Sequence, residues 1–365
     1  GEVVGNDDTA VGNPQTAEVG NESDASSVVE NSATATATET VEAVETTPTG
    51  YSLLDGVAHV MRKHHLSPVE RRLIDWHLAN LEGPSCAESD RLSLTEWNQD
   101  DDFAFQGPHV VVRRGFSALV EGMIADSGLD IRLNQTVHKV QVHDDGVQVH
   151  IGRGGVVPAD AVVSTLPLGV LKAEAVAFDP PLPEWKRNAI AKIGFGTFNK
   201  IVLRFSTAFW DTTTSFTGYC SDDKGEFYLF ANFVPITYKP VLVAMVIGRW
   251  AEWVERSSDT VVVERAMSIL RKMFGASVAP PTHWGVTRWG RDPFSRGSFS
   301  YVPPLASGAD YEALARPIHG RVLFAGEHTN AMWPNTVHGA YISGIREARR
   351  CCAILGQSSP GDTST

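Results

Sequence analysis

The chain has 365 residues and a formal net charge of −12, and the charge is unevenly distributed. Its first 50 residues hold ten Asp or Glu and no Lys or Arg, which leaves 33 acidic against 31 basic residues in the rest. No apolar run approaches the roughly 18 residues that span a membrane, so we expect no direct membrane association. The four cysteines show no CxxC spacing, which argues against a disulfide framework or a zinc site and is typical of a reducing compartment.

Residues 1–50 also lack aromatic side chains. Such a segment buries too little apolar surface to offset the entropy of ordering, so it is predicted to be disordered. An acidic arm for basic partners is one interpretation, and a solvated linker is the favoured one. Residues 51–365 are predicted to form the folded domain. The chain begins with Gly1 and shows no initiator Met or signal-peptide pattern, so we expect it to be part of a longer protein.

The first helix signal in the chain is Ser67-Pro68-Val69-Glu70, a capping box with proline at the first helical position. Apolar residues then repeat at helical spacing to about residue 82. Further on, Asp145-Gly146 is a hairpin turn signal between two alternating segments. The elements predicted in this part of the chain are a helix over 115–126 and strands over 137–142, 147–151 and 161–165.

In the middle of the chain, Val241–Ile247 is apolar at every position, which is typical of a central strand covered on both faces. A helix with Asp259 near its start runs to about Phe274 and closes at Gly275. Strands are also predicted over 200–205 and 226–230. Strands and helices alternate irregularly here, which favours an α+β region flanked by pieces of an α/β nucleotide-binding domain.

Near the C-terminus, Val322–Ala325 is a short buried strand that breaks at Gly326-Glu327. The Glu327 carboxylate therefore lies at the carboxyl end of a strand, where open α/β sheets bind cofactors. A helix opens after Pro334-Asn335-Thr336, and its N-terminal N–H groups suit an electron-rich ring. An ordinary βα unit with a surface Glu is the alternative. The residues predicted to face the core from this helix are Val337, Ala340, Tyr341, Ile345, Ala348 and Cys352.

Six segments in one order carry a family resemblance. AGEHT, PNTVHGA and SGIREA, within 325–348, together resemble the flavin-binding motif of the flavin-dependent amine oxidases. The upstream segments are similar to the lysine-specific histone demethylase branch of that family, and the resemblance covers about 66 to 355. These segments are LIDWHLANLE (73–82), LSLTEWNQDDDFAF (92–105), TLPLGVLK (165–172), PLPEW (181–185) and SRGSFSY (295–301).

The resemblance implies the C-terminal part of a two-subdomain FAD-dependent amine oxidase fold, combining α/β and α+β architecture, over residues 51–365. That part is the substrate subdomain with the last strand and helix of the FAD subdomain. Gly194-Phe195-Gly196 runs into a strand and the glycines of 152–155 close a hairpin, so neither is a phosphate loop. We therefore expect the N-terminal GxGxxG half to be absent, and this chain alone to be inactive.

The resemblance also implies FAD as the cofactor, and the removal of hydride from the carbon beside an amine nitrogen. It places Gly326 and Glu327 at the sugar-like hydroxyls of FAD, and Thr336-Val337 near the pyrimidine edge of the flavin. Val140 and Thr165-Leu166-Pro167 match positions at the adenosine end. Ordinary strand packing is the alternative for both and is favoured for Val140. No metal site is expected.

Trp289 and Tyr301 match aromatic residues that wall the amine channel beside the flavin, where they attract cations and exclude water. Core packing is the alternative for Trp289. Phe294 stands where the family often has Trp. A lysine that reaches the flavin through water is a family hallmark, and Lys239 is the candidate. A gapless match would place Tyr238 there instead, and a solvated loop residue is the alternative.

Asn80, Asp100, Asp101 and His109 match positions that meet a basic histone tail in the demethylases, and consecutive aspartates suit such a peptide. A solvated acidic turn is the alternative. Two departures weaken the match on this side of the site. Asn98 and Gly83 replace a carboxylate and an aromatic residue, respectively.

The resemblance predicts FAD-dependent oxidative demethylation of methylated lysine, of the histone H3 tail type, giving an imine and then formaldehyde and H2O2. It implies a methylated basic peptide as substrate, a corepressor-type chromatin partner and a nuclear location. A polyamine oxidase, with polyamine as substrate, is the alternative within the enzyme class, although the 97–105 motif argues against it. A catalytically inactive peptide-binding fragment is the third interpretation.

Overall fold

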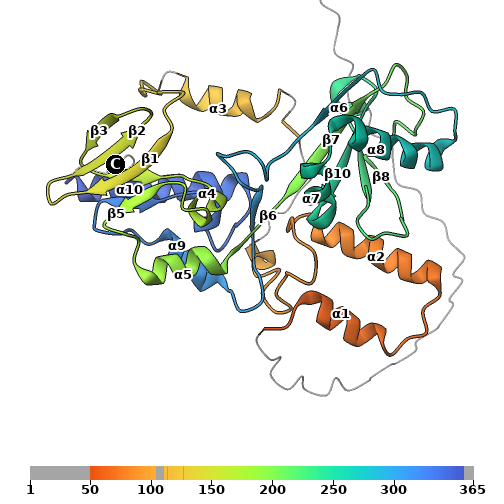
Figure 1. Cartoon of the computed structure of the whole chain (residues 1–365), viewed down its shortest axis with the longest axis horizontal. Helices are drawn as coiled ribbons and strands as arrows, with labels where there is room; N and C mark the ends of the chain where they lie inside the picture. Colours follow the sequence, from red (N-terminus) through yellow and green to blue (C-terminus); the bar gives the residue numbers. More distant parts are fainter. Residues whose placement is uncertain (1–49, 104–110, 113, 126, 357–365) are drawn as a thin grey trace, which may run out of the picture. The chain divides into compact units, whose positions relative to one another are not determined.

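The computed structural model describes residues 50–103, 111–112, 114–125 and 127–356. The segment predicted to be disordered lies outside them apart from Gly50, and so does His109. In the described residues, α-helices alternate with the strands of four sheets, which is the predicted mixed architecture (Figure 1). None of the helices in these ranges is long and apolar enough to cross a membrane.

The largest sheet has the strand order β11-β7-β10-β9-β8 and is antiparallel. Its central strand β10 spans Val241–Ile247, which confirms the prediction of a central strand there. The other strands are β7 (Phe198–Arg204), β8 (Phe216–Gly218), β9 (Leu229–Asn232) and β11 (His283–Val286). The helices associated with this sheet are α6 (Val234–Thr237), α7 (Gly248–Arg256) and α8 (Asp259–Phe274).

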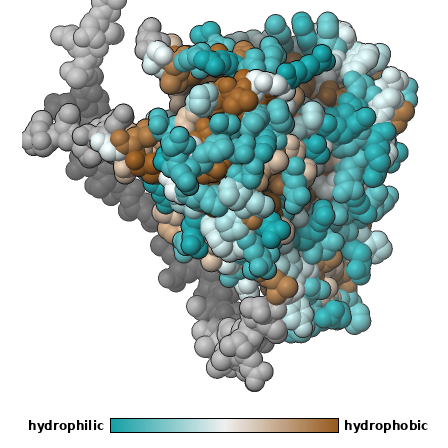
Figure 2. All heavy atoms as spheres, turned by 60° about the vertical axis from the view of Figure 1, so that its left-hand side comes forward, coloured by the Kyte–Doolittle hydropathy of each residue, from teal (hydrophilic) through white to brown (hydrophobic). Residues whose placement is uncertain are grey.

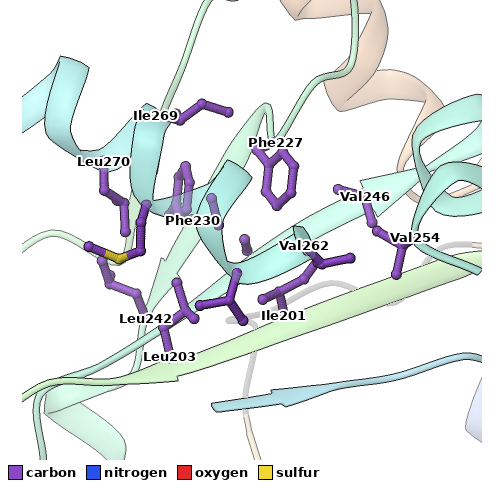
Figure 3. Packing of buried hydrophobic residues seen from close by; sticks show 14 of the residues in the cluster. Ile201, Leu203, Phe227, Phe230, Leu242, Val246, Val254, Val262, Ile269 and Leu270 are labelled. Carbon is purple, nitrogen blue, oxygen red and sulfur yellow. The ribbon is translucent and has the colours of Figure 1, made fainter. Parts of the chain in front are cut away.

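The main hydrophobic core lies between this sheet and helices α7 and α8, as Figure 3 shows. Ile201 and Leu203 of β7 are fully buried in it, together with Ile269 of α8. Because side chains alternate along a strand, the intervening residues Lys200 and Val202 face away from this core. The core therefore determines which face of β7 carries the lysine.

A second sheet has the order β3-β2-β1-β5. The predicted hairpin forms with the expected bounds, because β1 and β2 pair in antiparallel register on either side of the Asp145-Gly146 turn. The strands of this sheet are β1 (Val137–Val142), β2 (Val147–Ile151), β3 (Gly155–Ala159) and β5 (Ala177–Asp179).

Two small sheets complete the strand pairing. β13 (Val322–Phe324) runs parallel to β4 (Val162–Ser164), and β12 (Phe299–Tyr301) runs antiparallel to β6 (Gly194–Gly196). The glycines of β6 allow close packing instead of phosphate binding. A Cβ on Gly194 would lie 2.2 Å from the Tyr301 ring, and one on Gly196 would lie 2.1 Å from the Cys86 carbonyl oxygen.

Helix α2 begins as predicted. The Ser67 hydroxyl accepts a hydrogen bond from the Glu70 N–H, and the Glu70 carboxylate accepts one from the Ser67 N–H. The remaining α-helices are α1 (Leu53–Met61), α2 (Pro68–Glu82), α3 (Phe116–Ile124), α4 (Leu168–Lys172), α5 (Glu184–Lys192), α9 (Gly308–Ala315) and α10 (Val337–Ile354). Two 3₁₀ turns, η1 (Asp101–Phe103) and η2 (Glu327–Thr329), lie beside the predicted site residues.

The predicted core-facing side of α10 is wrong. The buried residues of this helix are Gly339, Ser343 and Glu347, which follow one another at intervals of four. Val337 and Tyr341 are each 54% exposed. Buried polar partners decide the orientation, because the Ser343 hydroxyl accepts the Gly326 N–H and the Glu347 carboxylate pairs with two arginines. Helix α3, by contrast, buries none of its residues, and Figure 2 shows apolar side chains exposed among the polar ones.

Candidate active site

The carboxyl ends of β13 and β4 lie next to each other, because Ala325 donates its N–H to the Ser164 carbonyl oxygen at 3.0 Å. The chain then turns at Gly326, whose φ of 133° favours glycine. A Cβ at this position would also lie 2.6 Å from the His328 ring. Glu327 thus follows a strand end directly, as the sequence predicts.

The Glu327 carboxylate is held by three donors. It accepts hydrogen bonds from the Ser300 N–H at 3.1 Å, the Ser300 hydroxyl at 2.6 Å and the Asn335 N–H at 2.8 Å. Tyr311 supports this arrangement by donating its hydroxyl to the Ser300 oxygen at 3.1 Å. Desolvation nevertheless dominates and raises the pKa of Glu327, while the three hydrogen bonds oppose it.

The Asn335 bond connects Glu327 to the start of α10. Thr336 is the N-cap of that helix, and its hydroxyl oxygen accepts the Gly339 N–H at 3.0 Å. Val337 opens the helix with its side chain more than half exposed. Glu327 is therefore hydrogen-bonded to the residue that directly precedes Thr336 and Val337.

Trp289 and Pro167, two residues predicted to contact the cofactor, line one pocket of about 250 Å³. We call it the Trp289 pocket. Phe299 is also part of its wall and directly precedes Ser300, so this pocket lies one residue from the Glu327 network. The lining residues are Pro167, Phe195, Phe198, Lys200, Trp289, Ser295, Gly297, Ser298 and Phe299.

The lysine in this pocket is Lys200, which the sequence analysis did not single out. Its ammonium lies 5.2 Å from the centroid of the Phe198 ring, and desolvation lowers its pKa. Lys239 is exposed in the turn between α6 and β10 and does not line the pocket. The alternation of β7 was the available signal, since it turns Lys200 away from the buried Ile201.

Two of the residues matched to the adenosine end, Val140 and Leu166, pack in the same hydrophobic cluster. Val140 is 3% exposed and lies on β1. Leu166 is partly buried between two clusters, and Thr165 is exposed. The Ser164 hydroxyl just before them is buried and has no hydrogen-bond partner in the described part of the chain.

The acidic loop, Asp100–Asp102, lies close to the start of α10. The Trp333 indole N–H donates to the Phe103 carbonyl oxygen at 2.9 Å, which connects the end of η1 to the segment before Thr336. Asp101 accepts a hydrogen bond from the Asn98 side chain at 2.9 Å, so the residue that replaces a carboxylate orients the loop. Desolvation, followed by the charge of Asp101, raises the pKa of Asp100.

The other substrate-side residues lie on α2 and β12. Asn80 donates its side-chain amide to the Trp76 carbonyl oxygen at 3.0 Å, and Tyr301 is 8% exposed against Gly194. At Gly83, a Cβ would lie 2.5 Å from the Tyr228 hydroxyl. Tyr228, which directly precedes β9, thus occupies the space next to position 83 that a side chain there would need.

A larger pocket of about 560 Å³ lies between α4, β5 and α5, but none of the predicted site residues lines it. The chemistry-bearing residues gather instead at the Trp289 pocket and the Glu327 network. Among the described residues no group of His, Cys, Asp or Glu could hold a metal ion. The described residues thus form a mixed α/β and α+β protein, with candidate cofactor-binding residues at the ends of two parallel strands.

Comparison with known proteins agrees with this class. The chain belongs to the family described as flavin containing amine oxidoreductase, whose model matches residues 45–352. It is 42% identical over 316 residues to "Possible lysine-specific histone demethylase 1" of Drosophila melanogaster, covering 78% of this chain and 35% of that protein. It is 41% identical over 304 residues to "Lysine-specific histone demethylase 1 homolog 3" of Arabidopsis thaliana, covering 80% and 19%.

A third relative is "Histone demethylase-like protein A" of Aspergillus fumigatus, 39% identical over 332 residues, with 85% of this chain and 31% of that protein covered. The family resemblance stated from the motifs is therefore confirmed, and a flavin is the cofactor type of the family. The chain spans 19% to 35% of the length of these three relatives.

Proposed function

We propose that residues 51–365 are the C-terminal part of an FAD-dependent amine oxidase domain that demethylates lysine in a basic peptide of the histone tail type. One observation carries this proposal. The Trp289 pocket combines Lys200, whose ammonium lies 5.2 Å from the centroid of the Phe198 ring, with aromatic walls, and it adjoins the strand-end carboxylate of Glu327 through Phe299 and Ser300.

The residues present fit a flavin dinucleotide. The Ser164 hydroxyl is buried without a partner at the strand end, which leaves a hydrogen-bonding group for a ligand. Apolar surface is exposed where the ring is expected, since Trp289 is 42% and Val337 54% exposed. Glu327 and the start of α10 would hold the cofactor, and helix N-termini favour negative charge there.

A bound flavin would supply the hydride acceptor for oxidation at the carbon next to the amine nitrogen. The aromatic walls of the Trp289 pocket would exclude water and attract the incoming cationic amine. Lys200 would present a hydrogen-bond donor to a water in the pocket, and its lowered pKa eases proton release. We therefore assign the role first predicted for Lys239 to Lys200.

The proposed substrate follows from the acidic loop and from the relatives. Asp100 and Asp101 lie on a segment that the Trp333 indole fixes beside the start of α10, so a basic peptide could be captured next to the pocket. Two of the relatives are named as lysine-specific histone demethylases. A nuclear location and a corepressor-type chromatin partner belong to the same proposal.

The test compares two lysine variants in the full-length protein supplied with FAD. Lys200→Met should abolish most oxidation of a methylated lysine peptide while flavin stays bound, and Lys239→Met should keep activity within about twofold, because Lys239 is an exposed loop residue. Peroxide release reports activity, and flavin absorbance reports binding. Equal loss in both variants would refute the assignment of Lys200. Faster oxidation of spermine than of any methylated peptide would replace the demethylase proposal by a polyamine oxidase.

A further inference from the structure

Two buried polar side chains hold the segment that carries Trp289. Asn199, on β7 next to Lys200, is fully buried and donates its side-chain amide to the Glu255 carboxylate at 2.7 Å. Glu255 lies on α7 and is 9% exposed. The pair therefore joins the strand that carries the pocket lysine to the helix that covers the opposite face of the sheet.

Together these side chains bind three consecutive backbone N–H groups. Asn199 accepts the Trp289 N–H at 3.1 Å, and Glu255 accepts those of Gly290 at 2.9 Å and Arg291 at 3.0 Å. The Arg291 side chain also donates to the Glu255 carbonyl oxygen at 3.1 Å. Three successive peptide planes are thus fixed by side chains and not by strand pairing.

The Thr287 hydroxyl extends the network to the lysine itself. It donates to the Asn199 side-chain oxygen at 3.1 Å and accepts the Lys200 N–H at 2.8 Å. Thr287 also donates its backbone N–H to the Lys200 carbonyl oxygen at 3.0 Å. The Asn199 side-chain amide therefore links the backbone at Trp289 directly, and the backbone at Lys200 through Thr287.

We propose that Asn199 and Glu255 are positioning residues, which orient the Trp289 indole relative to Lys200 across the pocket. This inference rests on the proposed function, because it gives the two residues a role in aligning substrate and flavin. A buried amide–carboxylate pair suits that task, since its hydrogen bonds are directional and an unpaired partner is strongly disfavoured. Simple cohesion of the fold would need no such orientation of Trp289.

Asn199→Asp is the informative variant, because it changes one donor into an acceptor and hardly alters volume. Two carboxylates would then face each other at hydrogen-bond distance, and at neutral pH they would repel and release the 289–291 segment. At acid pH the pair can share one proton, which restores the hydrogen bond. In Asn199→Asp with Glu255→Gln, the donor and acceptor exchange places. The side-chain pair and the bonds to the Trp289 N–H and the Thr287 hydroxyl re-form, while the glutamine oxygen can accept only one of the Gly290 and Arg291 N–H groups.

The readout independent of activity is fluorine NMR of this chain labelled with 5-fluorotryptophan. Trp289→Phe assigns the Trp289 resonance among the nine tryptophans. We expect Asn199→Asp to shift and broaden that resonance at pH 7.5, and expect the double variant or a pH near 5 to restore it. Asn232→Asp is the matched control. Asn232 is a buried β9 amide whose side-chain hydrogen bonds, among the described residues, go to Trp210, Thr212, Thr214 and Val234, so its variant should leave the Trp289 signal in place.

The second readout is steady-state oxidation by the flavin-loaded full-length protein. Asn199→Asp should lower kcat roughly tenfold to a hundredfold with a smaller change in KM, since misplacement by about 1 Å has effects of that size. The double variant should recover most of the loss. An unmoved Trp289 resonance in Asn199→Asp, or a shift of equal size in Asn232→Asp, would overturn the positioning role. If the unmodified protein oxidises no amine, the proposed function fails, and the fluorine measurement still decides the inference.

Discussion

Replacing Glu327 by alanine should destabilise the chain, because its carboxylate accepts hydrogen bonds from three donors, the Ser300 N–H, the Ser300 hydroxyl and the Asn335 N–H. The substitution leaves the Ser300 and Asn335 N–H groups without their acceptor, and the Ser300 hydroxyl loses its 2.6 Å bond. An unsatisfied buried donor costs about 1–3 kcal/mol, so the two backbone groups set a range of roughly 2–6 kcal/mol. Water can enter the space left by the side chain, so we expect about 3 kcal/mol.

The assay is urea unfolding followed by tryptophan fluorescence, with the midpoint and slope compared between variants. Glu312→Ala on α9 is the matched control, because Glu312 is exposed and such changes stay within about 0.5 kcal/mol. The pH dependence gives a second check. A carboxyl whose pKa is raised by folding contributes stability below its ordinary value of 4.5 and loses it as the pH rises through the folded pKa. The difference between wild type and Glu327→Ala should therefore shrink as the pH rises above 4.5.

A change below 1 kcal/mol in Glu327→Ala, with an unchanged slope, would refute the argument that Glu327 organises this region. A difference that grows as the pH rises would contradict the direction of the pKa shift, because it would mean that the hydrogen bonds outweigh desolvation.

Three further predictions concern other parts of the fold. Gly196→Ala should lower the free energy of unfolding by about 1–3 kcal/mol or more, because its Cβ would lie 2.1 Å from a carbonyl oxygen. The control Gly122→Ala in α3 meets nothing within 4 Å and should raise the free energy of unfolding by up to about 1 kcal/mol, measured by thermal or urea unfolding. Burial lowers the pKa of Lys186 to about 7 in the folded chain, whereas the ordinary lysine value is 10.5. Between these two pH values the unfolded chain binds more protons, so the stability of the wild type should rise with pH. Lys186→Met should lack this rise when unfolding midpoints are measured against pH. Asp100→Asn with Asp101→Asn should raise KM for a methylated basic peptide and leave kcat nearly unchanged, an effect that weakens as salt shortens the Debye length from about 10 Å at 0.1 M to about 3 Å at 1 M. An unchanged KM at low salt would remove the acidic loop from the substrate site.

Elements with strong local signals were predictable from the sequence. The capping box at Ser67, the turn at Asp145-Gly146 and the uninterrupted apolar run of β10 each specify their element within a few residues. The buried face of α10 was not predictable in this way. Counting apolar residues selects Val337 and Tyr341, but the buried side is chosen by hydrogen bonds from Gly326 and by two arginines that pair with Glu347.

The candidate site shows the same limit. Glu327 could be located because a strand and a glycine break precede it directly. Lys200 could not be connected to Trp289, because 88 residues separate them and only the tertiary fold brings both to one pocket. Resemblance pointed to Lys239 through its position just before β10, where a gapless match would place Tyr238. The alternation of burial along β7, which turns Lys200 away from the core, depends on a face that only packing determines.

The close approach of Tyr228 to Gly83 constrains how this protein can evolve. Any side chain at position 83 meets the Tyr228 hydroxyl at 2.5 Å, but the next ring atom is 3.6 Å away, which is an ordinary contact. A residue larger than glycine at 83 therefore requires either the loss of this oxygen, as in Tyr228→Phe, or a movement of the Tyr228 side chain. The residue tolerated after ANLE thus depends on a side chain 145 positions further along the chain.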